Sequence, residues 1–488
     1  PENLIYIMVT TVTTWYAALR IGNNQERQSA YLKEQKSELT REEKRAYKES
    51  QTRIRKRMLA ACLLLNLGIL AVVKYTNFAI ANANGLLELL GQPGRLSFVT
   101  LALPMGISFY TFQAAGYLVD VYRGTASCER SLLRFALFLS FFPQLVQGPI
   151  SRFGDLSRTL LYEEHSFDGG AVCRGLQRVL WGYFKKMVVA DRILAGVGTL
   201  IQNPDAYGGA YVLVEMLFYT AELYADFTGG IDVTIGVAET LGVRVQENFR
   251  RPYFSKSLKE YWRRWHISMS QWFKDYLFYP VSVSGPMTRF AKFCRKRFGA
   301  EAGKRLPVYA ASFLVWLATG IWHGASWNFV VWGLANWAVL MLSEELEPLY
   351  ARFHGRFPVG ETVWYRSFQI LRTFLLVCCL NLFDCYPSAA VTLRQFGSLF
   401  NASNWSVLWD GSLLAIGLSA ADYAVLAAGT AVMLGVSLLQ RGGSVRERIG
   451  GLPYPARFAV WYGLFVAVLL LGIYGVGYDA SQFIYNQF

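Results

Sequence analysis

The feature of this sequence that most restricts its fold is a series of apolar runs, each about 18 residues long or longer. A helix rises about 1.5 Å per residue, so each run is long enough to cross the roughly 30 Å hydrocarbon layer of a membrane. The chain has 488 residues, of which 53% are hydrophobic and 15% aromatic. The runs are 58–75, 97–118, 131–148, 209–238, 308–345, 364–385, 413–440 and 457–477.

These runs predict an all-α integral membrane protein, because a lipid-exposed backbone must satisfy its own hydrogen bonds. The longer runs have room for two passes or a re-entrant pair, so we expect about ten to twelve transmembrane helices plus interfacial and re-entrant helices. We find no repeat at a fixed period, and we expect residues 1–488 to form a single multi-pass domain. Residues 1–21 read as a membrane helix that begins before this numbering, without the features of a cleavable signal peptide.

The formal charge of +14 is carried by Lys and Arg blocks that lie between the apolar runs. This is the positive-inside pattern of membrane proteins, and it argues against a nucleic-acid partner. The blocks, which we place at the cytoplasmic face, are 24–57, 151–192, 286–305 and 441–457. Residues 24–57 combine charges of both signs with good helix formers, and we expect one exposed cytoplasmic helix that connects two membrane segments.

A histidine lies among tryptophans and arginines in "EYWRRWHISMSQWFKDYLFYP", residues 260–280. Read as one helix from Ser257, this stretch has an aromatic face and an opposite polar face. The polar face carries Lys259, Arg263, His266, Ser270 and Lys274. One interpretation is an amphipathic helix in the headgroup region. The other is an entrance for an anionic donor such as coenzyme A or a phosphopantetheine arm. The two interpretations are compatible.

A second histidine, His323, follows about 15 largely apolar residues and precedes another apolar run. An ionisable residue at such depth faces a bundle interior or an aqueous cavity, so a functional role is the first hypothesis. Burial favours the neutral imidazole, which can accept a proton. Gly320 and Gly324 flank His323 and allow close approach of a helix or a substrate. A structural histidine with satisfied hydrogen bonds is the alternative.

Carboxyl groups also recur along one face of the apolar run 209–238, where Glu215, Tyr219, Glu222 and Asp226 follow helical spacing. In a membrane such groups pair with cations or line a polar cavity. We expect pairing with Arg or Lys from another helix, and direct proton transfer is the alternative. Asn328 is a further candidate as an oxyanion donor, although packing is the more ordinary role for it.

Several common sites are missing from the sequence. It has no G-x-S-x-G, P-loop or H-E-x-x-H motif, so it does not have the usual signatures of serine hydrolases, NTPases or zincin metalloproteases. Its seven cysteines include no C-x-x-C, so they predict reduced core thiols and no metal site. A transporter would also explain carboxyl groups inside a membrane, but it predicts paired repeats.

Most of the chain resembles the membrane-bound O-acyltransferase family, and within it the bacterial branch that O-acetylates alginate and other surface polysaccharides. The block W-R-R-W-H-I-S-x-S-x-W-F-x-D-Y, followed about 50 residues later by W-H-G, is the most specific part of this resemblance. Residues 380–390, "LNLFDCYPSAA", depart from the pattern expected of the family. The segments that carry the resemblance are 103–124, 141–153, 184–192, 224–236, 247–280, 320–333 and 477–488.

The resemblance implies a fold in which a cytosolic funnel and an outward-facing funnel meet near a catalytic histidine. By motif match this is His323, while His266 lies on the cytosolic side of the tunnel. It also implies a catalytic core at 97–345 and C-terminal helices at 360–488.

The implied activity transfers an acetyl group from a cytosolic thioester, acetyl-CoA or a carrier protein, across the bacterial inner membrane to a polysaccharide acceptor. An extracytoplasmic SGNH-like acetyltransferase is the expected partner, and no tightly bound cofactor is expected. D-alanyl transfer from a carrier protein to teichoic acid, by a related branch of the family, is the alternative.

Overall fold

The computed structural model describes residues 3–92, 96–101 and 103–474, and this part of the chain is helical and holds no strand. It therefore has the predicted all-α architecture. The chain divides into two compact units, one of residues 1–168 with 242–245 and the other of residues 169–241 with 246–488. The segment 477–488, which contributes to the family resemblance, lies outside the described residues.

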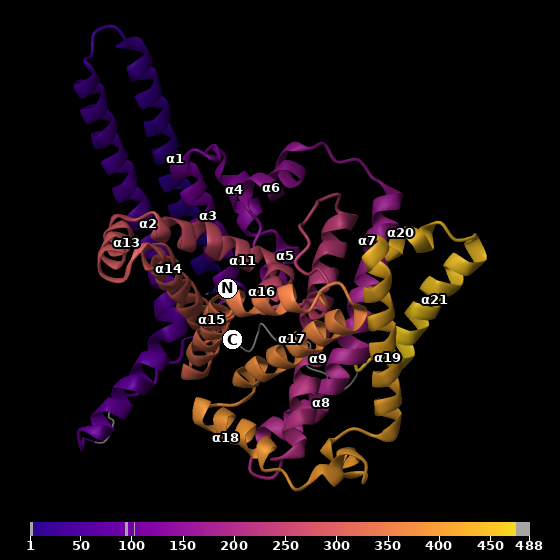
Figure 1. The fold of residues 1–488 in the computed structure, drawn as a ribbon. Helices are drawn as coiled ribbons and strands as arrows, with labels where there is room; N and C mark the ends of the chain where they lie inside the picture. The colour runs from indigo at the N-terminus through magenta and orange to yellow at the C-terminus, as the bar shows by residue number, and fades with distance from the viewer. Residues whose placement is uncertain (1–2, 93–95, 102, 475–488) are drawn as a thin grey trace. The chain divides into compact units, whose positions relative to one another are not determined.

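The first unit begins with two long helices, α1 (Leu4–Glu34) and α2 (Arg41–Leu89), which run side by side in Figure 1. Thr40 starts α2 with a capping box, because its hydroxyl accepts from the Glu43 backbone N–H and the Glu43 carboxylate accepts from Thr40 N–H at 2.8 Å. The expectation of one continuous helix over residues 24–57 is therefore wrong. Helix α1 ends at Glu34, and the chain turns back on itself before α2 begins (Figure 1).

The apolar run 131–148 does not form one helix either. It divides into α4 (Leu132–Leu139) and α5 (Phe142–Gln147), separated by an extended turn at Phe141. Pro143 is the physical reason, since proline has no N–H to bond the carbonyl oxygen four residues back, at Leu139, and its ring clashes with that carbonyl group. The other helices of this unit are α3 (Ile107–Arg123), α6 (Phe153–Ser157) and the π-helical η1 (Arg158–Tyr162).

In the second unit, α9 (Ala210–Thr240) packs along α7 (Gly169–Tyr183) through glycines spaced seven residues apart on both helices. A Cβ atom on Gly175 would lie 2.5 Å from the carbonyl oxygen of Gly236, and one on Gly182 would lie 2.6 Å from that of Gly229. The pairs run in opposite directions, so the helices are antiparallel and their backbones touch. This contact places η2 (Phe184–Ala190), which follows α7, beside Asp226 of α9.

We expect Gly182→Ala to destabilise the protein by about 1–3 kcal/mol, because the added methyl group must push α7 away from α9. Gly198→Ala is the matched control in α8 (Asp191–Gln202), where the nearest atom to the new Cβ is 3.9 Å away. That control should be neutral or stabilising by up to about 1 kcal/mol. Thermal unfolding of both variants in detergent measures the difference, and equal melting temperatures would contradict the close helix contact.

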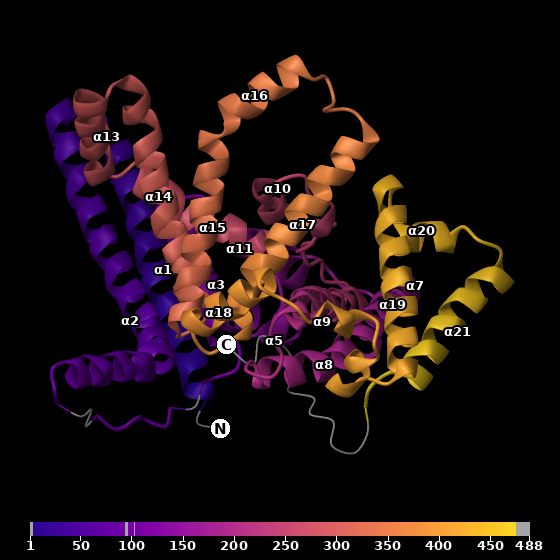
Figure 2. The same cartoon turned by 60° about the horizontal axis from the view of Figure 1, so that its bottom comes forward.

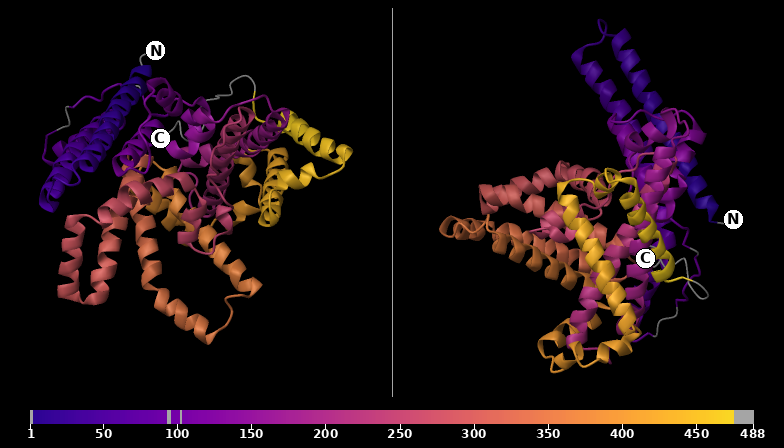
Figure 3. Two further views of the ribbon diagram at one scale, coloured as in Figure 1. Left: turned by 90° about the horizontal axis from the view of Figure 1, so that it is seen from above. Right: turned by 90° about the vertical axis from the view of Figure 1, so that its right-hand side faces the viewer.

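The remainder of the second unit surrounds this pair. Helices α15 (Trp327–Glu345) and α17 (Val363–Cys385) contact each other and are joined by α16 (Glu347–Arg356) in an arch that Figure 2 shows clearly. Helices α19 (Ala420–Leu439) and α21 (Tyr454–Leu471) both contact η2 (Phe184–Ala190), and α20 (Val445–Gly450) lies between them in the chain, as Figures 2 and 3 show in yellow. The elements are η2 (Phe184–Ala190), η3 (Pro252–Phe254), α10 (Leu258–Arg264), α11 (Ile267–Phe273), η4 (Lys274–Phe278), α12 (Tyr279–Ser282), α13 (Gly285–Phe298), α14 (Ala300–His323), α15 (Trp327–Glu345), α16 (Glu347–Arg356), α17 (Val363–Cys385), α18 (Ala389–Phe400), η5 (Trp405–Leu408), η6 (Ser412–Ile416), α19 (Ala420–Leu439), η7 (Gln440–Gly442), α20 (Val445–Gly450) and α21 (Tyr454–Leu471).

Within the described residues, six helices are long and apolar enough to cross a membrane, or seven if the bent pair α15 and α16 counts as one span. Length and apolarity alone therefore do not reach the expected ten to twelve spans. One reason is α9, whose buried carboxyl groups lower its apolarity. The six helices are α1, α2, α14, α17, α19 extended to Gly442, and α21.

Candidate active site

The stretch that carries His266 is not one helix. Helix α10 ends at Arg264, and α11 begins at Ile267, while His266 between them adopts a left-handed backbone conformation with φ 44°. A histidine in this region is uncommon, and it must be held there by its surroundings. The predicted polar face that joined His266 to three cations is therefore wrong. The break turns the imidazole inward, and His266 is fully buried.

Asn248 holds this break from 18 residues upstream. Its backbone carbonyl accepts from Ile267 N–H at 3.0 Å, and its side-chain Oδ1 accepts from Ser268 N–H at 3.0 Å and from Ser268 Oγ at 2.9 Å. These bonds satisfy the first N–H groups of α11, which no side chain within the stretch caps. Sequence reasoning missed Asn248, because nothing local distinguishes it from an ordinary loop asparagine.

The same side chain determines the tautomer of His266. Because Oδ1 of Asn248 accepts from a backbone N–H, its other terminal atom is the amide nitrogen, and this lies 3.3 Å from Nδ1 of His266. The amide donates, so Nδ1 accepts and the neutral imidazole carries its proton on Nε2. His266 is thereby a hydrogen-bond donor through Nε2.

Burial, together with the charge that His323 can carry, lowers the pKa of His266 from 6.5 to about 3. The folded protein thus binds a proton at His266 more weakly than the unfolded chain does. In the unfolded chain this histidine has its ordinary pKa of 6.5. Above that pH the imidazole is neutral in both states and costs no stability. Below it, stability is lost progressively as the pH falls toward about 3.

We expect the protein to lose about 2 kcal/mol of stability between about pH 7.5 and pH 5 through His266. His266→Asn should flatten this part of the pH dependence, since asparagine does not titrate and tolerates the left-handed conformation. His354→Asn is the control, and it should leave the pH dependence of stability as in the wild type. The ring of His354 lies 3.0 Å from the Tyr365 hydroxyl. The measurement is the free energy of unfolding across this pH range. If His266→Asn left the dependence of this free energy on pH unchanged, the lowered pKa of His266 would be contradicted.

His323 is the last residue of α14, and Gly324 after it is extended. Its ring lies against two aromatic rings, with centroid distances of 4.6 Å to Trp332 and 5.0 Å to Trp322. The expectation that glycines permit close approach here is confirmed. A Cβ atom on Gly320 would lie 2.4 Å from the Phe329 carbonyl oxygen, and one on Gly324 would overlap the Phe329 ring.

Trp322 places the two histidines around one buried indole. Its ring centroid is 6.1 Å from that of His266 and 5.0 Å from that of His323. Phe227 of α9 also contacts His266 edge-on, with 5.0 Å between the ring centroids. Two imidazoles that are 57 residues apart in the sequence thus lie against the same indole ring.

The three cations assigned to a donor entrance lie on the surface, away from the buried imidazole. Lys259 pairs with Glu344 at 2.7 Å, and Arg263 donates to the Lys259 carbonyl oxygen at 3.3 Å. Lys274 lies over the Tyr279 ring. Ser270 donates to the Trp262 carbonyl oxygen at 3.1 Å and so braces the two short helices. The structure does not bring these residues together with His266 on one face.

Asp226 and Glu215 of α9 have partners inside the second unit. Asp226 pairs with Lys186 at 2.5 Å, and Lys186 also contacts Asp191 at 2.7 Å, as expected for a buried acid beside a cation. Glu222 is buried one turn away. Glu215 instead accepts from the Tyr386 hydroxyl at 2.5 Å.

Asn328 ties α15 to the end of α17, because its amide nitrogen donates to the Tyr386 carbonyl oxygen. This bond gives it a packing role. Within the described part of the chain, no group of three or more His, Cys, Asp or Glu residues could hold a metal ion.

The model of the membrane-bound O-acyltransferase family matches residues 126–294, which include His266 and Asn248. Over 365 residues the chain is 34% identical to the probable alginate O-acetylase of Pseudomonas putida, which covers 73% of this chain and 67% of that protein. The chain belongs to the membrane-bound O-acyltransferase family.

Other relatives of this membrane-bound O-acyltransferase differ in the substrate that their names give. The probable alginate O-acetylase of Pseudomonas aeruginosa is 38% identical over 366 residues, covering 73% of this chain and 63% of that protein. The peptidoglycan O-acetyltransferase of Helicobacter pylori is 28% identical over 321 residues, covering 61% of this chain and 57% of that protein. The chain thus spans less than two thirds of the length of several relatives. Its family and its long apolar helices make it a multi-pass membrane protein.

Proposed function

We propose that this protein takes an acetyl group from a cytosolic thioester and passes it across the bacterial inner membrane for O-acetylation of an extracytoplasmic polysaccharide. The observation that carries the proposal is the pair of histidines around Trp322, of which His266 is fully buried. The similarity to alginate and peptidoglycan O-acetyltransferases supports the acetyl group and the polymeric acceptor.

In this proposal, His323 acts as the general base. Its neutral imidazole takes the proton from an acceptor hydroxyl while the hydroxyl oxygen attacks the thioester carbonyl carbon. The tetrahedral intermediate then breaks its carbon–sulfur bond, and the imidazolium returns the proton to the leaving thiolate. The products are an acetyl ester and a free thiol, so the histidine ends as it began. General acid–base catalysis of this kind contributes about 10²–10⁴ in rate.

His266 has a different task, because its proton lies on Nε2. An N–H donor beside the base can stabilise the negative charge that develops on the carbonyl oxygen, and a donor held rigidly costs little reorganisation during the reaction. The left-handed backbone and the bonds from Asn248 hold His266 in this way. We assign His323 to proton transfer and His266 to charge stabilisation.

The donor in this account is acetyl-CoA or an acyl carrier protein, and the surface cations Lys259, Arg263 and Lys274 attract its phosphate charges on the cytosolic side. The acetyl group reaches the polymer with an extracytoplasmic SGNH-like acetyltransferase as partner.

Incubation of the purified full chain with labelled acetyl-CoA and a polysaccharide acceptor tests the proposal. The expected result is release of free coenzyme A, with label on the polysaccharide once the extracytoplasmic partner is added. A parallel reaction supplies D-alanyl carrier protein and teichoic acid. Turnover of the D-alanyl thioester alone would overturn acetyl transfer, and turnover of neither would count against acyl transfer altogether.

A further inference from the structure

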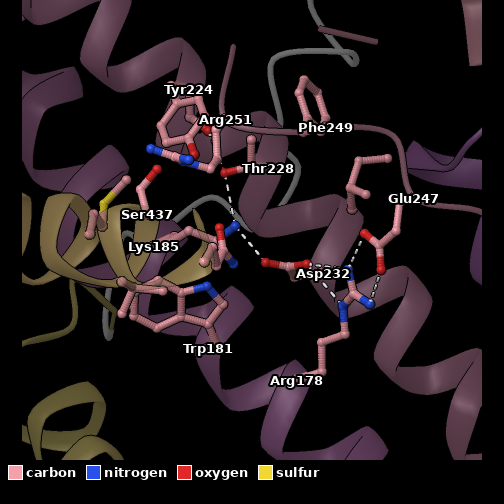
Figure 4. Close-up of a pocket in the computed structure, with 14 residues that line it drawn as sticks. Arg178, Trp181, Lys185, Tyr224, Thr228, Asp232, Glu247, Phe249, Arg251 and Ser437 are labelled. Carbon is pink, nitrogen blue, oxygen red and sulfur yellow. Dashed lines mark hydrogen bonds and ion pairs between the residues drawn. The ribbon is translucent and has the colours of Figure 1, made fainter. Parts of the chain in front are cut away.

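A second polar site lies in the same unit and has no part in the mechanism above. It is a pocket of about 80 Å³ between α7, η2, α9, the segment 247–251 and α19. Figure 4 shows its charged residues together with Trp181, Tyr224 and Phe249. The space is large enough for a small polar group with ordered water.

Two of the three cations at this pocket are already paired. Arg178 donates two hydrogen bonds of 2.6 Å to Glu247 and lies 2.8 Å from Asp232. Lys185 lies 2.6 Å from the other oxygen of Asp232 and donates to Thr228 at 2.8 Å. Figure 4 shows this chain of bonds as dashed lines. Two positive groups are thereby balanced by two carboxylates.

Arg251 is the third cation, and no carboxylate of the pocket compensates its charge. Among the described residues it has no carboxylate within ion-pair distance, and its buried Nε has no hydrogen-bond partner. Its guanidinium packs over the Phe254 ring at 4.5 Å and reaches into the pocket beside Ser437. Burial, with the nearby charges of Arg264 and Arg441, lowers the pKa of Arg251.

The backbone holds Arg251 in place. Its φ of 51° is left-handed, and Arg251 and His266 are the two non-glycine residues in this conformation within the part of the chain that is described. Such a conformation is costly for a long side chain and persists where the surrounding structure enforces it. The neighbouring residue Arg250 donates its N–H to the Arg264 carbonyl oxygen at 2.9 Å, which links this segment to the end of α10.

We propose that this pocket binds a phosphate group at Arg251. A guanidinium matches two phosphate oxygens, and Ser437 and Gln440 supply further donors. Met433 and Val436 of α19 form an apolar wall, and α19 belongs to a candidate membrane span that ends at Gly442. This position near the end of a span favours the headgroup of an anionic phospholipid over free phosphate. The site is independent of acyl transfer.

Binding of three probes to the purified full chain in neutral detergent tests the site. The probes are dioctanoyl phosphatidylglycerol, dioctanoyl glycerol, which lacks the phosphate, and inorganic phosphate. We expect phosphatidylglycerol to bind and Arg251→Gln to weaken it about tenfold or more. Arg251→Lys should bind with intermediate affinity. Arg289→Gln, at an exposed arginine of α13, is the matched control and should bind as the wild type does.

A variant that is expected to increase the affinity for phosphate provides a second test if the Arg251 variants fail to fold. Glu247→Gln removes one carboxylate from the rim of the pocket, so phosphate should bind about two- to tenfold more tightly. Arg251-dependent binding of inorganic phosphate alone would assign the site to free phosphate. Phosphatidylglycerol affinity that is unchanged in folded Arg251→Gln, or in Glu247→Gln, would overturn the proposal.

Discussion

Replacing His323 with alanine should lower acetyl transfer from the thioester by about 10²–10⁴, the contribution typical of a general base. The loss should appear mainly in kcat, because the histidine removes a proton in the transition state while the donor is bound by other residues. Little change in folding is expected, since His323 is half-buried at the end of α14.

The measurement is release of coenzyme A from labelled acetyl-CoA by the purified variant, with its melting temperature compared with that of the wild type. His354→Ala is the matched control, because this histidine belongs to α16 and bonds the Tyr365 hydroxyl. The control should retain full turnover. A folded His323→Ala protein that turns over at the wild-type rate would remove His323 from the mechanism.

Replacing Asn248 with aspartate should reduce turnover by about 10² or more while the protein stays folded. One carboxylate oxygen can still accept from Ser268 N–H and Oγ, so the break between α10 and α11 keeps its support. The other oxygen then faces Nδ1 of His266 and accepts in place of donating. The proton moves to Nδ1, the Nε2 donor is lost, and the negative charge raises the pKa of His266 from about 3.

Turnover and the ¹⁵N resonances of a labelled imidazole report the two halves of this prediction. Ser268→Ala is the control, because it removes one bond to Asn248 and leaves the amide nitrogen beside His266. That variant should retain the Nε2–H tautomer and most of the activity. Full activity of Asn248→Asp, with its tautomer shown to be reversed, would mean that the Nε2 proton has no role in the chemistry.

The apolar runs predicted most of the architecture, because burial in lipid leaves a signal in composition alone. Helices α17, α19 and α21 fall close to their runs, and the run that contains His323 divides at that residue into α14 and α15. The pairing of Asp226 with a cation was also predictable, since an unpaired carboxylate in that position is too costly.

The fine structure of the site depends on contacts between distant segments, which periodicity cannot reveal. Residues 257–276 fit a continuous amphipathic helix by spacing, yet the bonds from Asn248 support a break at His266. The same limit applies to Arg251, whose uncompensated charge becomes visible only when Arg178 and Lys185 are seen to use the nearby carboxylates. Helical spacing does not show which residues are exposed either. The cations that spacing placed beside His266 lie on the surface, whereas its imidazole is buried.

The most direct test of acetyl transfer across the membrane uses sealed inside-out membrane vesicles from bacterial cells that produce this protein and the polysaccharide, with the cytoplasmic face outward. Labelled acetyl-CoA is added outside, and label in the enclosed polysaccharide is measured over time. The account predicts label on the enclosed polymer in wild-type vesicles and none above background in vesicles that carry His323→Ala. Equal labelling of the enclosed polymer in both kinds of vesicle would contradict it.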